Sequence, residues 1–219
     1  MLKEQLFENI NIKYKMKHKF IKFSALLMSF FLFSCTVSYE KPNYKLMFDN
    51  LEDISKDYVN LDKLIVVKVN TQELYFLNKG VIKEKFSIST SLYGTGSEVN
   101  SYKTPLGRHV IAEKIGKNLP FGAILKGREW TGSIANIIKE PIDTEFDIVT
   151  SRILWLKGLE EGLNLGPGVD SMSRYIYIHG TAEEGLIGKP ASDGCVRMYN
   201  SDVIYLFKKV DTNTQVWIL

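Results

Sequence analysis

Cysteine and histidine are scarce in this sequence of 219 residues, which contains two cysteines and three histidines. The cysteines are Cys35, which ends an apolar stretch near the N-terminus, and Cys195. Beyond that stretch, one cysteine and two histidines cannot form a closed tetrahedral metal shell unless carboxylates complete it. No carboxylates occur at a recognisable metal-binding spacing, so we expect no metal site.

Nucleotide-binding glycine motifs are also absent. The sequence has neither the phosphate-loop nor the dinucleotide-binding fingerprint, and it shows no internal repeat. Excess charge is missing from most of the chain, since six of the 28 basic residues but two of the 25 acidic residues precede Cys35. The formal net charge of +3 therefore belongs to the N-terminal segment. We expect no cofactor and no nucleic-acid partner.

Residues 1–34 resemble a secretory signal peptide, in which Met16 is a candidate start. A basic segment at residues 17–22 precedes an apolar run at residues 23–33. That run is shorter than the ~20 residues of a membrane-spanning helix. It leads through Leu-Phe-Ser to Cys35, as in a bacterial lipoprotein cleavage site. We therefore expect Cys35 to be lipidated and to anchor the protein to a membrane on the periplasmic side of the cell envelope.

Two alternatives stay open for Cys35. Signal cleavage without lipidation would leave a soluble periplasmic protein, and a disulfide with Cys195 would give both cysteines a structural role. If Cys35 is lipidated, Cys195 is the sole free thiol of an exported chain. A lone cysteine in an oxidising compartment is a liability unless it is buried or used.

The remaining sequence has the composition of one globular domain, with 45% hydrophobic and 24% charged residues overall. Residues 35–62 are predicted to form a tether and residues 63–219 a single domain. One short helix is predicted at residues 202–209, capped by Asn200 or Ser201. Strands are predicted around residues 64–69, 74–77, 81–90, 110–111, 148–156, 175–178 and 214–219. The fold class is therefore mainly β with few short helices.

Residues 115–146 carry glycine, proline and Trp130 with little periodicity. We expect a long excursion that forms one wall or a lid of a substrate cleft, with a plain surface loop as the alternative. His109 lies beside a predicted strand and has no cysteine partner in sequence. We therefore expect His109 to have a packing role.

Residues 175–200 pair a histidine with a cysteine. Alternating Tyr and Ile at residues 175–178 predict a half-buried strand that ends at His179, and Gly180 is expected to turn the chain. Sixteen positions after His179, Cys195 follows a Ser-Asp-Gly turn that can point backbone amides in front of the sulfur. A thiol, a base and amide donors for an oxyanion are the components of nucleophilic acyl chemistry.

These residues resemble a known family signature. His-Gly at residues 179–180, a spacer and SDGCVRM at residues 192–198 are similar to the signature of the L,D-transpeptidase catalytic domain family. That signature is HG, a spacer, then SHGC, Ile or Val, Arg, and Met or Leu. KTPLG at residues 103–107 resembles the TPxG segment of the family. The resemblance covers roughly residues 64–219.

The resemblance implies a β-sandwich or capped-barrel architecture with Cys195 at the mouth of a cleft. It implies that His179 takes the thiol proton and that the carbonyl of Gly180 orients the imidazole. Backbone N–H groups near Gly194 and Cys195 are expected to hold the oxyanion. A thioester acyl-enzyme would result.

Several neighbouring residues have two interpretations each. Arg197 is expected to contact substrate or to favour the thiolate, and an ion pair with Asp193 or Asp202 is the structural alternative. Ser192 is expected either to bind substrate or to cap the turn. Asp193 stands where the family most often has histidine, and its carboxylate would oppose thiolate formation unless it points away or pairs with Arg197. Tyr177 packs by default, or lines the cleft.

The resemblance implies a peptidoglycan stem tetrapeptide as substrate. Attack at the carbonyl of the third stem residue would release the terminal D-alanine, and an amine would then accept the acyl group. The acceptor is the side chain of another stem, which gives a cross-link between third residues, a lysine of an outer-membrane lipoprotein, or a free D-amino acid. Carbapenems should inhibit better than penicillins. With water as acceptor the protein is instead a cysteine peptidase, and without catalysis it is a wall-binding lipoprotein.

Overall fold

The computed structural model describes residues 61–219, so the predicted signal segment (1–34) and almost all of the tether (35–62) lie outside the described residues. Met16 and Cys35 are among those undescribed positions. The strands are β1 Lys63–Lys68, β2 Glu73–Asn78, β3 Val81–Ser89, β4 Gly107–Ile115, β5 Ala123–Lys126, β6 Glu129–Ile134, β7 Val149–Gly158, β8 Tyr177–Thr181, β9 Val196–Met198 and β10 Gln215–Ile218. The helical elements are η1 Glu184–Leu186 and α4 Asn200–Lys209.

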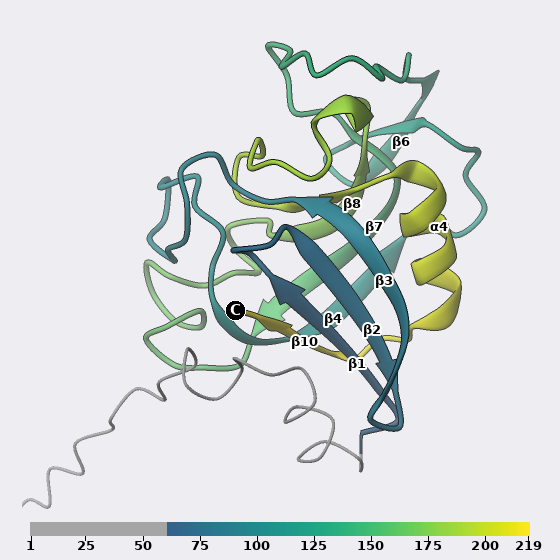
Figure 1. Cartoon of the computed structure of the whole chain (residues 1–219). Helices are drawn as coiled ribbons and strands as arrows, with labels where there is room; N and C mark the ends of the chain where they lie inside the picture. The colour runs from purple at the N-terminus through teal and green to yellow at the C-terminus, as the bar shows by residue number, and fades with distance from the viewer. Residues whose placement is uncertain (1–60) are drawn as a thin grey trace, which may run out of the picture. The chain divides into compact units, whose positions relative to one another are not determined.

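The sheet closes into a ring. Its strand order is β4-β10-β1-β2-β3-β9-β8-β7, and β4 pairs with β7 to complete the circle (Figure 1). Two pairs are parallel, β1 with β10 and β8 with β9, and the other strand pairs are antiparallel. A closed ring leaves its strands no unpaired edge. Only the β5–β6 hairpin lies outside the circle, attached to β7 through β5.

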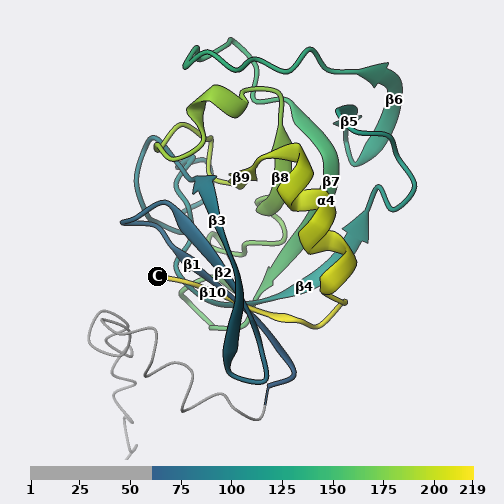
Figure 2. The same cartoon turned by 45° about the vertical axis from the view of Figure 1, so that its right-hand side comes forward.

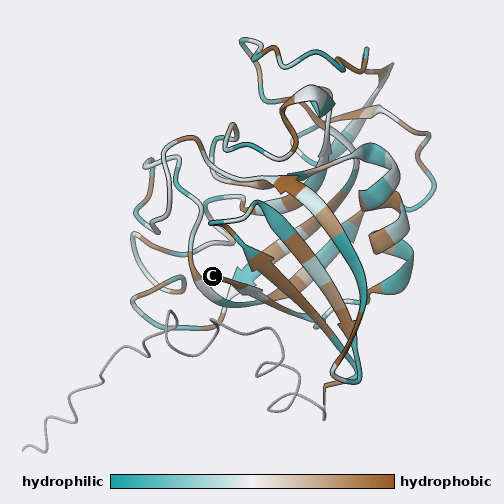
Figure 3. Cartoon of the chain, in the orientation of Figure 1, coloured by the Kyte–Doolittle hydropathy of each residue, from teal (hydrophilic) through white to brown (hydrophobic). Residues whose placement is uncertain are grey.

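The main hydrophobic core fills the ring, and α4 covers it. Every strand of the ring contributes one or two buried apolar side chains to this core, and α4 adds Val203, Leu206 and Phe207. Figure 2 shows α4 lying against β7 and β8. In Figure 3 the brown, hydrophobic stretches follow these strands and alternate with polar ones. The capped-barrel architecture and the mainly β class expected from the sequence are therefore confirmed.

Strand β1 shows why the N-terminal half was predictable. Four consecutive residues, Leu64 to Val67, are all buried. Ile65 and Val67 face the main core, while Leu64 and Val66 join a second cluster with Trp217 on the opposite face. A strand that is buried on both faces appears in sequence as a continuous run of branched apolar residues. The predicted turns and strands through β3 follow from this pattern.

The excursion at residues 115–146 contains a hairpin, β5–β6, that the sequence analysis did not predict, because β6 is exposed throughout and has no apolar alternation. The predicted helix caps were wrong. The helix α4 begins at Asn200, and its N-cap is Tyr199, which makes no side-chain capping bond. Asn200 and Ser201 are therefore helical residues rather than caps.

His109 is fully buried in β4, in agreement with its expected packing role. Its ring nitrogens lie 3.0 Å from the carbonyl oxygen of Gly107 and 2.9 Å from Oγ of Ser171. Burial lowers the pKa of His109 to about 4, so the imidazole is neutral over the physiological range. Within residues 61–219, no helix is long and apolar enough to cross a bilayer.

Candidate active site

The parallel pair β8–β9 brings the two halves of the sequence motif together. His179 is in register with Arg197, and Ile178 with Val196. Cys195, one residue before β9, therefore lies beside Tyr177. Because alternate residues of a strand share a face, the side chains of Tyr177, His179, Cys195 and Arg197 project from the same side of the sheet.

His179 is held in one orientation and left with a free nitrogen. Its Nδ1 lies 2.7 Å from the carbonyl oxygen of Gly180, which can only accept, so Nδ1 carries the proton. In the neutral ring, Nε2 is then an acceptor, and it is buried with no hydrogen-bond partner. Burial lowers the pKa of His179, which favours this neutral form. The predicted orienting role of the Gly180 carbonyl matches this contact.

Gly180 does not turn the chain. β8 runs from Tyr177 to Thr181, so His179 sits at the centre of the strand rather than at its end. Glycine is required at position 180 by close packing: a Cβ there would lie 2.6 Å from Oδ1 of Asn200 and 2.8 Å from the Thr150 carbonyl oxygen. The sequence analysis assigned Gly180 to a turn, whereas the glycine is needed because Asn200 and Thr150 approach its Cα closely.

Asn200, the first residue of α4, connects that helix to β7 and β8 through its side chain. Its Oδ1 accepts hydrogen bonds of 2.6 Å from both Thr150 and Ser151 on β7. Its Nδ2 donates 2.8 Å bonds to the Thr181 carbonyl and to Glu184. A buried side-chain amide whose donors and acceptor are all hydrogen-bonded holds its partners in fixed positions. Asn200 thus fixes the strand that carries His179.

Cys195 is a half-buried free thiol. Its Sγ lies 3.4 Å from the Tyr175 carbonyl oxygen, to which it donates, and it accepts from the Tyr177 N–H at 3.3 Å. Burial, followed by the charge of Asp147, raises the pKa of Cys195 to about 12. Because the thiol pKa is raised and the imidazole pKa is lowered, the resting pair is a neutral thiol and a neutral imidazole.

Hydrogen bonds from Ser192 and from Thr104 hold the turn at residues 192–194 in place. Ser192 Oγ donates to the Cys195 carbonyl oxygen at 2.6 Å and accepts from the Gly194 N–H at 3.3 Å. Thr104, from the KTPLG segment, donates to the Gly194 carbonyl oxygen at 3.0 Å. Gly194 has a φ of +115°, in the region that favours glycine. Ser192 therefore occupies the turn-capping position, and these contacts explain why KTPLG accompanies the motif.

Arg197 is buried between two carboxylates. It is 2% exposed, and its guanidinium pairs with Glu183 at 2.8 Å and with Asp147 at 2.9 Å. These partners differ from Asp193 and Asp202, which the sequence analysis had proposed. The guanidinium is enclosed by these two carboxylates, so the structural alternative of an ion pair holds for Arg197, with other partners than expected.

Asp147, and not Asp193, is the carboxylate whose charge acts on both Cys195 and His179. Asp193 is exposed and is not among the groups that shift the pKa of Cys195. Asp147 raises the pKa values of both Cys195 and His179. One of its oxygens, Oδ1, is buried without a hydrogen-bond partner. Oδ1 of Asp147, Nε2 of His179 and Nε of Arg197 are the buried side-chain atoms without a partner within residues 61–219.

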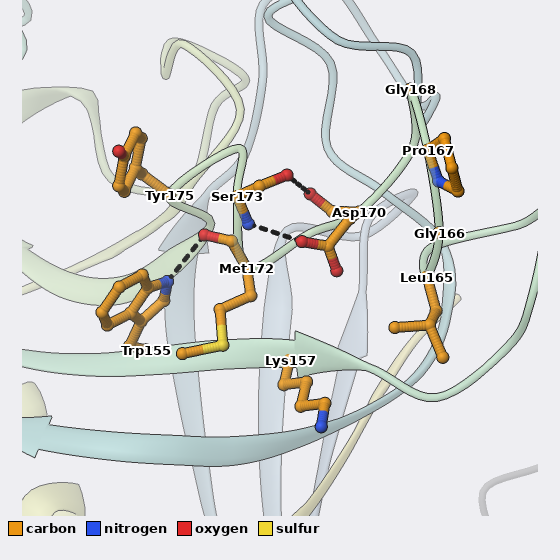
Figure 4. Close-up of a pocket in the computed structure, with 10 residues that line it drawn as sticks. All are labelled: Trp155, Lys157, Leu165, Gly166, Pro167, Gly168, Asp170, Met172, Ser173 and Tyr175. Carbon is orange, nitrogen blue, oxygen red and sulfur yellow. Dashed lines mark hydrogen bonds between the residues drawn. The ribbon is translucent and has the colours of Figure 1, made fainter.

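A pocket of about 650 Å³ is lined by Tyr175, the residue whose carbonyl oxygen lies near Sγ of Cys195 (Figure 4). Trp155, Met172 and Tyr175 lie on one side of it and the segment 165–168 on the other. The Tyr175 carbonyl oxygen accepts from Cys195, so the aromatic wall of the pocket is one residue from the thiol. The Trp155 and Tyr175 rings stack with centroids 6.0 Å apart.

Arg128 brings the β5–β6 hairpin to this aromatic wall. Its guanidinium lies 4.4 Å from the Trp155 ring centroid and 5.4 Å from that of Tyr175. It also donates to the Tyr177 hydroxyl at 3.4 Å. The excursion therefore reaches the candidate site through Arg128, whereas Trp130 is 46% exposed and does not line the pocket.

Sequence reasoning missed Asp147, Glu183, Asn200 and Arg128 as site residues. Glu183 had the strongest available signal, because it lies four residues after His179 inside the spacer. Asp147 lies 50 residues before Arg197 in sequence, with no pattern linking the two. Arg128 could not be placed without the hairpin.

The comparisons with known proteins agree with the motif. Residues 62–218 match the family model of the L,D-transpeptidase catalytic domain. Two Bacillus subtilis (strain 168) proteins that carry L,D-transpeptidase names match over shorter stretches. YqjB is 46% identical over 45 residues, which are 20% of this chain and 26% of YqjB. YkuD is 49% identical over 49 residues, which are 22% of this chain and 30% of YkuD.

Two solved L,D-transpeptidase structures overlap more widely at lower identity. The enzyme from Mycobacterium smegmatis is 14% identical with a TM-score of 0.43, over 72% of this chain and 58% of that chain. One from Mycobacterium tuberculosis H37Rv is 14% identical with a TM-score of 0.45, over 72% and 57%. The family match rests on the family model rather than on these overlaps.

We predict that replacing the buried arginine, Arg197→Met, destabilises the domain by about 3–5 kcal/mol, because it leaves Glu183 and Asp147 buried without a counter-charge. Urea unfolding measures the change. The control is Lys63→Met, which removes a more exposed pair with Asp211 and should cost less than about 1 kcal/mol. Equal effects of the two substitutions would contradict the role assigned to Arg197.

Proposed function

The chain belongs to the L,D-transpeptidase catalytic domain family, and from this premise we propose that it is a peptidoglycan L,D-transpeptidase with Cys195 as nucleophile and His179 as general base. One observation carries the residue assignment. The Nε2 of His179 is an unpartnered, buried acceptor on the same face of the sheet as the thiol. A base in that condition is available to take a proton.

The proton transfer follows from the charge state of the pair. Because thiol and imidazole are both neutral at rest, the thiol proton passes to Nε2 as the sulfur attacks. In the structure Sγ is turned to the Tyr175 carbonyl. Rotation about the Cα–Cβ bond of Cys195 would redirect it toward His179. The Gly180 carbonyl and the charge of Asp147 both favour the imidazolium that forms.

The proposed acylation and acyl transfer form and break the following bonds. The sulfur bonds to the carbonyl carbon of the third stem residue, and the bond from that carbon to the nitrogen of the terminal D-alanine breaks. The imidazolium returns its proton to the leaving amine. An acceptor amine attacks the thioester, forms the new amide and releases the thiol. Backbone N–H groups at Gly194 and Cys195 are the proposed oxyanion donors, for which the Gly194 N–H must leave Ser192 Oγ.

The aromatic pocket beside Cys195 is the proposed site for one of the two stem peptides. Its wall of Trp155 and Tyr175 offers apolar area, and Lys157 and Asp170 offer one charge of each sign (Figure 4). A stem peptide carries amines and carboxylates, which suits such a lining. Arg128, at the rim, is the proposed contact for a stem carboxylate. Either a stem side-chain amine, a lipoprotein lysine or a free D-amino acid is the acceptor.

We predict that a disaccharide tetrapeptide and a carbapenem each form a covalent adduct on Cys195, seen by intact-mass spectrometry of residues 36–219. Cys195→Ala should give no adduct, and His179→Gln should give far less than wild type, because the base is lost. Ser201→Ala, an exposed residue of α4 that does not line the pocket, is the matched control and should react normally. Product masses separate an amine acceptor from water. Absence of any adduct on the wild type would refute the enzymatic proposal.

We further predict that alkylation of Cys195 by iodoacetamide accelerates with pH throughout the range from about 6 to 9. The raised pKa of the thiol leaves a thiolate fraction of about 10⁻⁵ at neutral pH, and each pH unit increases it about tenfold. The same chain unfolded in urea should instead level off near pH 9. An acid-side plateau in the folded protein would indicate a thiolate–imidazolium pair and contradict the neutral resting state.

We also propose that the protein is exported and anchored through a lipid on Cys35, at the periplasmic side of the cell envelope. The signal-like residues before Cys35 support this proposal. Expression with radiolabelled palmitate should label the wild type but not Cys35→Ser, and the labelled protein should partition into detergent. Label retained in Cys35→Ser would refute the anchor.

A further inference from the structure

A second pocket, of about 560 Å³, lies at the C-terminal end of α4. Its lining residues are Lys114, Lys117, Asn118, Arg152, Phe207 and Lys208. None of them belongs to the candidate active site. In Figure 2 the C-terminal end of α4 lies beside β4, the strand that supplies Lys114. Four of the six lining residues are cationic and none is acidic.

Arg152 is the unusual member of this pocket. It is 6% exposed and lies on β7 just after Ser151, whose φ of 59° and register shift mark a bulge. Its Nη1 donates to the carbonyl oxygens of Leu119 at 2.9 Å and Ser151 at 2.7 Å. No carboxylate in the described part of the chain pairs with it. Arg197, by contrast, has two carboxylate partners.

The other edge of the Arg152 guanidinium faces the pocket. Its Nε and Nη2 have no protein acceptor, and neither is among the enclosed, unpartnered atoms found within residues 61–219. Both therefore remain accessible, and the pocket that Arg152 lines is the space available to them. Burying a cation without a counter-charge costs free energy, and the burial of Arg152 lowers the pKa of its guanidinium.

The three lysines line the same pocket as Arg152. Lys114 Nζ donates to the Val210 carbonyl and lies 4.4 Å from the Phe207 ring centroid, while the Arg152 guanidinium lies 5.7 Å from the same ring. Lys117 and Lys208 are exposed at the rim. Asp211, the carboxylate that acts on Lys114, is itself paired with Lys63. The positive charge in the pocket is thus left uncompensated by the described protein.

We propose that this pocket binds a phosphate ester, with the phosphate between Arg152 and the three lysines. A planar guanidinium edge with several ammonium groups is the arrangement that proteins use for phosphate. The volume exceeds that of a lone phosphate ion, and Asn118 adds a hydrogen-bonding group at the rim, so the ligand carries the phosphate on a sugar or polyol. The source is either a soluble phosphate ester or the headgroup of an anionic lipid.

The test uses residues 36–219, which lack the apolar segment and the proposed lipid anchor at Cys35, and two probes. Glycerol 3-phosphate is titrated by calorimetry, and vesicles of phosphatidylcholine with and without phosphatidylglycerol are tested by co-sedimentation. We expect saturable binding in one or both arms, and the arm that responds identifies the source. The double substitution Lys117→Gln/Lys208→Gln should weaken it at least about tenfold while leaving the thermal midpoint unchanged, because both side chains are exposed.

The matched control is Lys209→Gln, which removes an exposed lysine from the same end of α4 but outside the pocket. It should bind like the wild type, as should Cys195→Ala, so this test is independent of the proposed enzymatic activity. Glycerol in place of glycerol 3-phosphate should not bind. No saturable binding in either arm, or equal losses in Lys209→Gln and in the double variant, would overturn the proposal.

Discussion

The buried guanidinium of Arg197 holds together parts of the chain that are remote in sequence. It lies across from His179 in the β8–β9 pair and binds Glu183, just beyond β8, and Asp147, just before β7. Charges this deeply enclosed are tolerable only as a matched set, since each would otherwise remain unpaired away from water. The position of Asp147, and hence the electrostatic environment of both Cys195 and His179, depends on that set.

The same enclosure determines the resting chemistry. Removing water raises the pKa of the Cys195 thiol and lowers that of the His179 imidazole, so both groups are uncharged before substrate arrives. A neutral thiol is protected from adventitious reaction, since the thiolate is the reactive form. The charge of Asp147 acts against burial on His179, because it raises the pKa of the imidazole and favours the imidazolium.

The sequence was sufficient for the mainly β class and for the positions of most strands along the chain, and the motif residues His179 and Cys195 lie on one face of the β8–β9 pair. Continuous branched runs, as in β1, and turn residues carry strong local signals. The failures concern positions where the cause is not local. Gly180 is glycine because Asn200 approaches it, and Asp147 matters because Arg197 reaches it. Neither contact has a spacing that a single sequence reveals. The predictions for Met16 and Cys35 concern residues outside the described part.

The strand order has a consequence for how the domain is built. β10 is the last of the ten strands along the chain, yet it lies between β1, which it pairs in parallel, and β4. The contacts between Ile65 and Val216 join residues about 150 positions apart, a long-range pairing of the kind that slows folding. A ribosome must deliver nearly all of this polypeptide before the barrel can close. Until then β9, the strand that begins just after Cys195 and pairs with β3 and β8, belongs to an open and incomplete sheet.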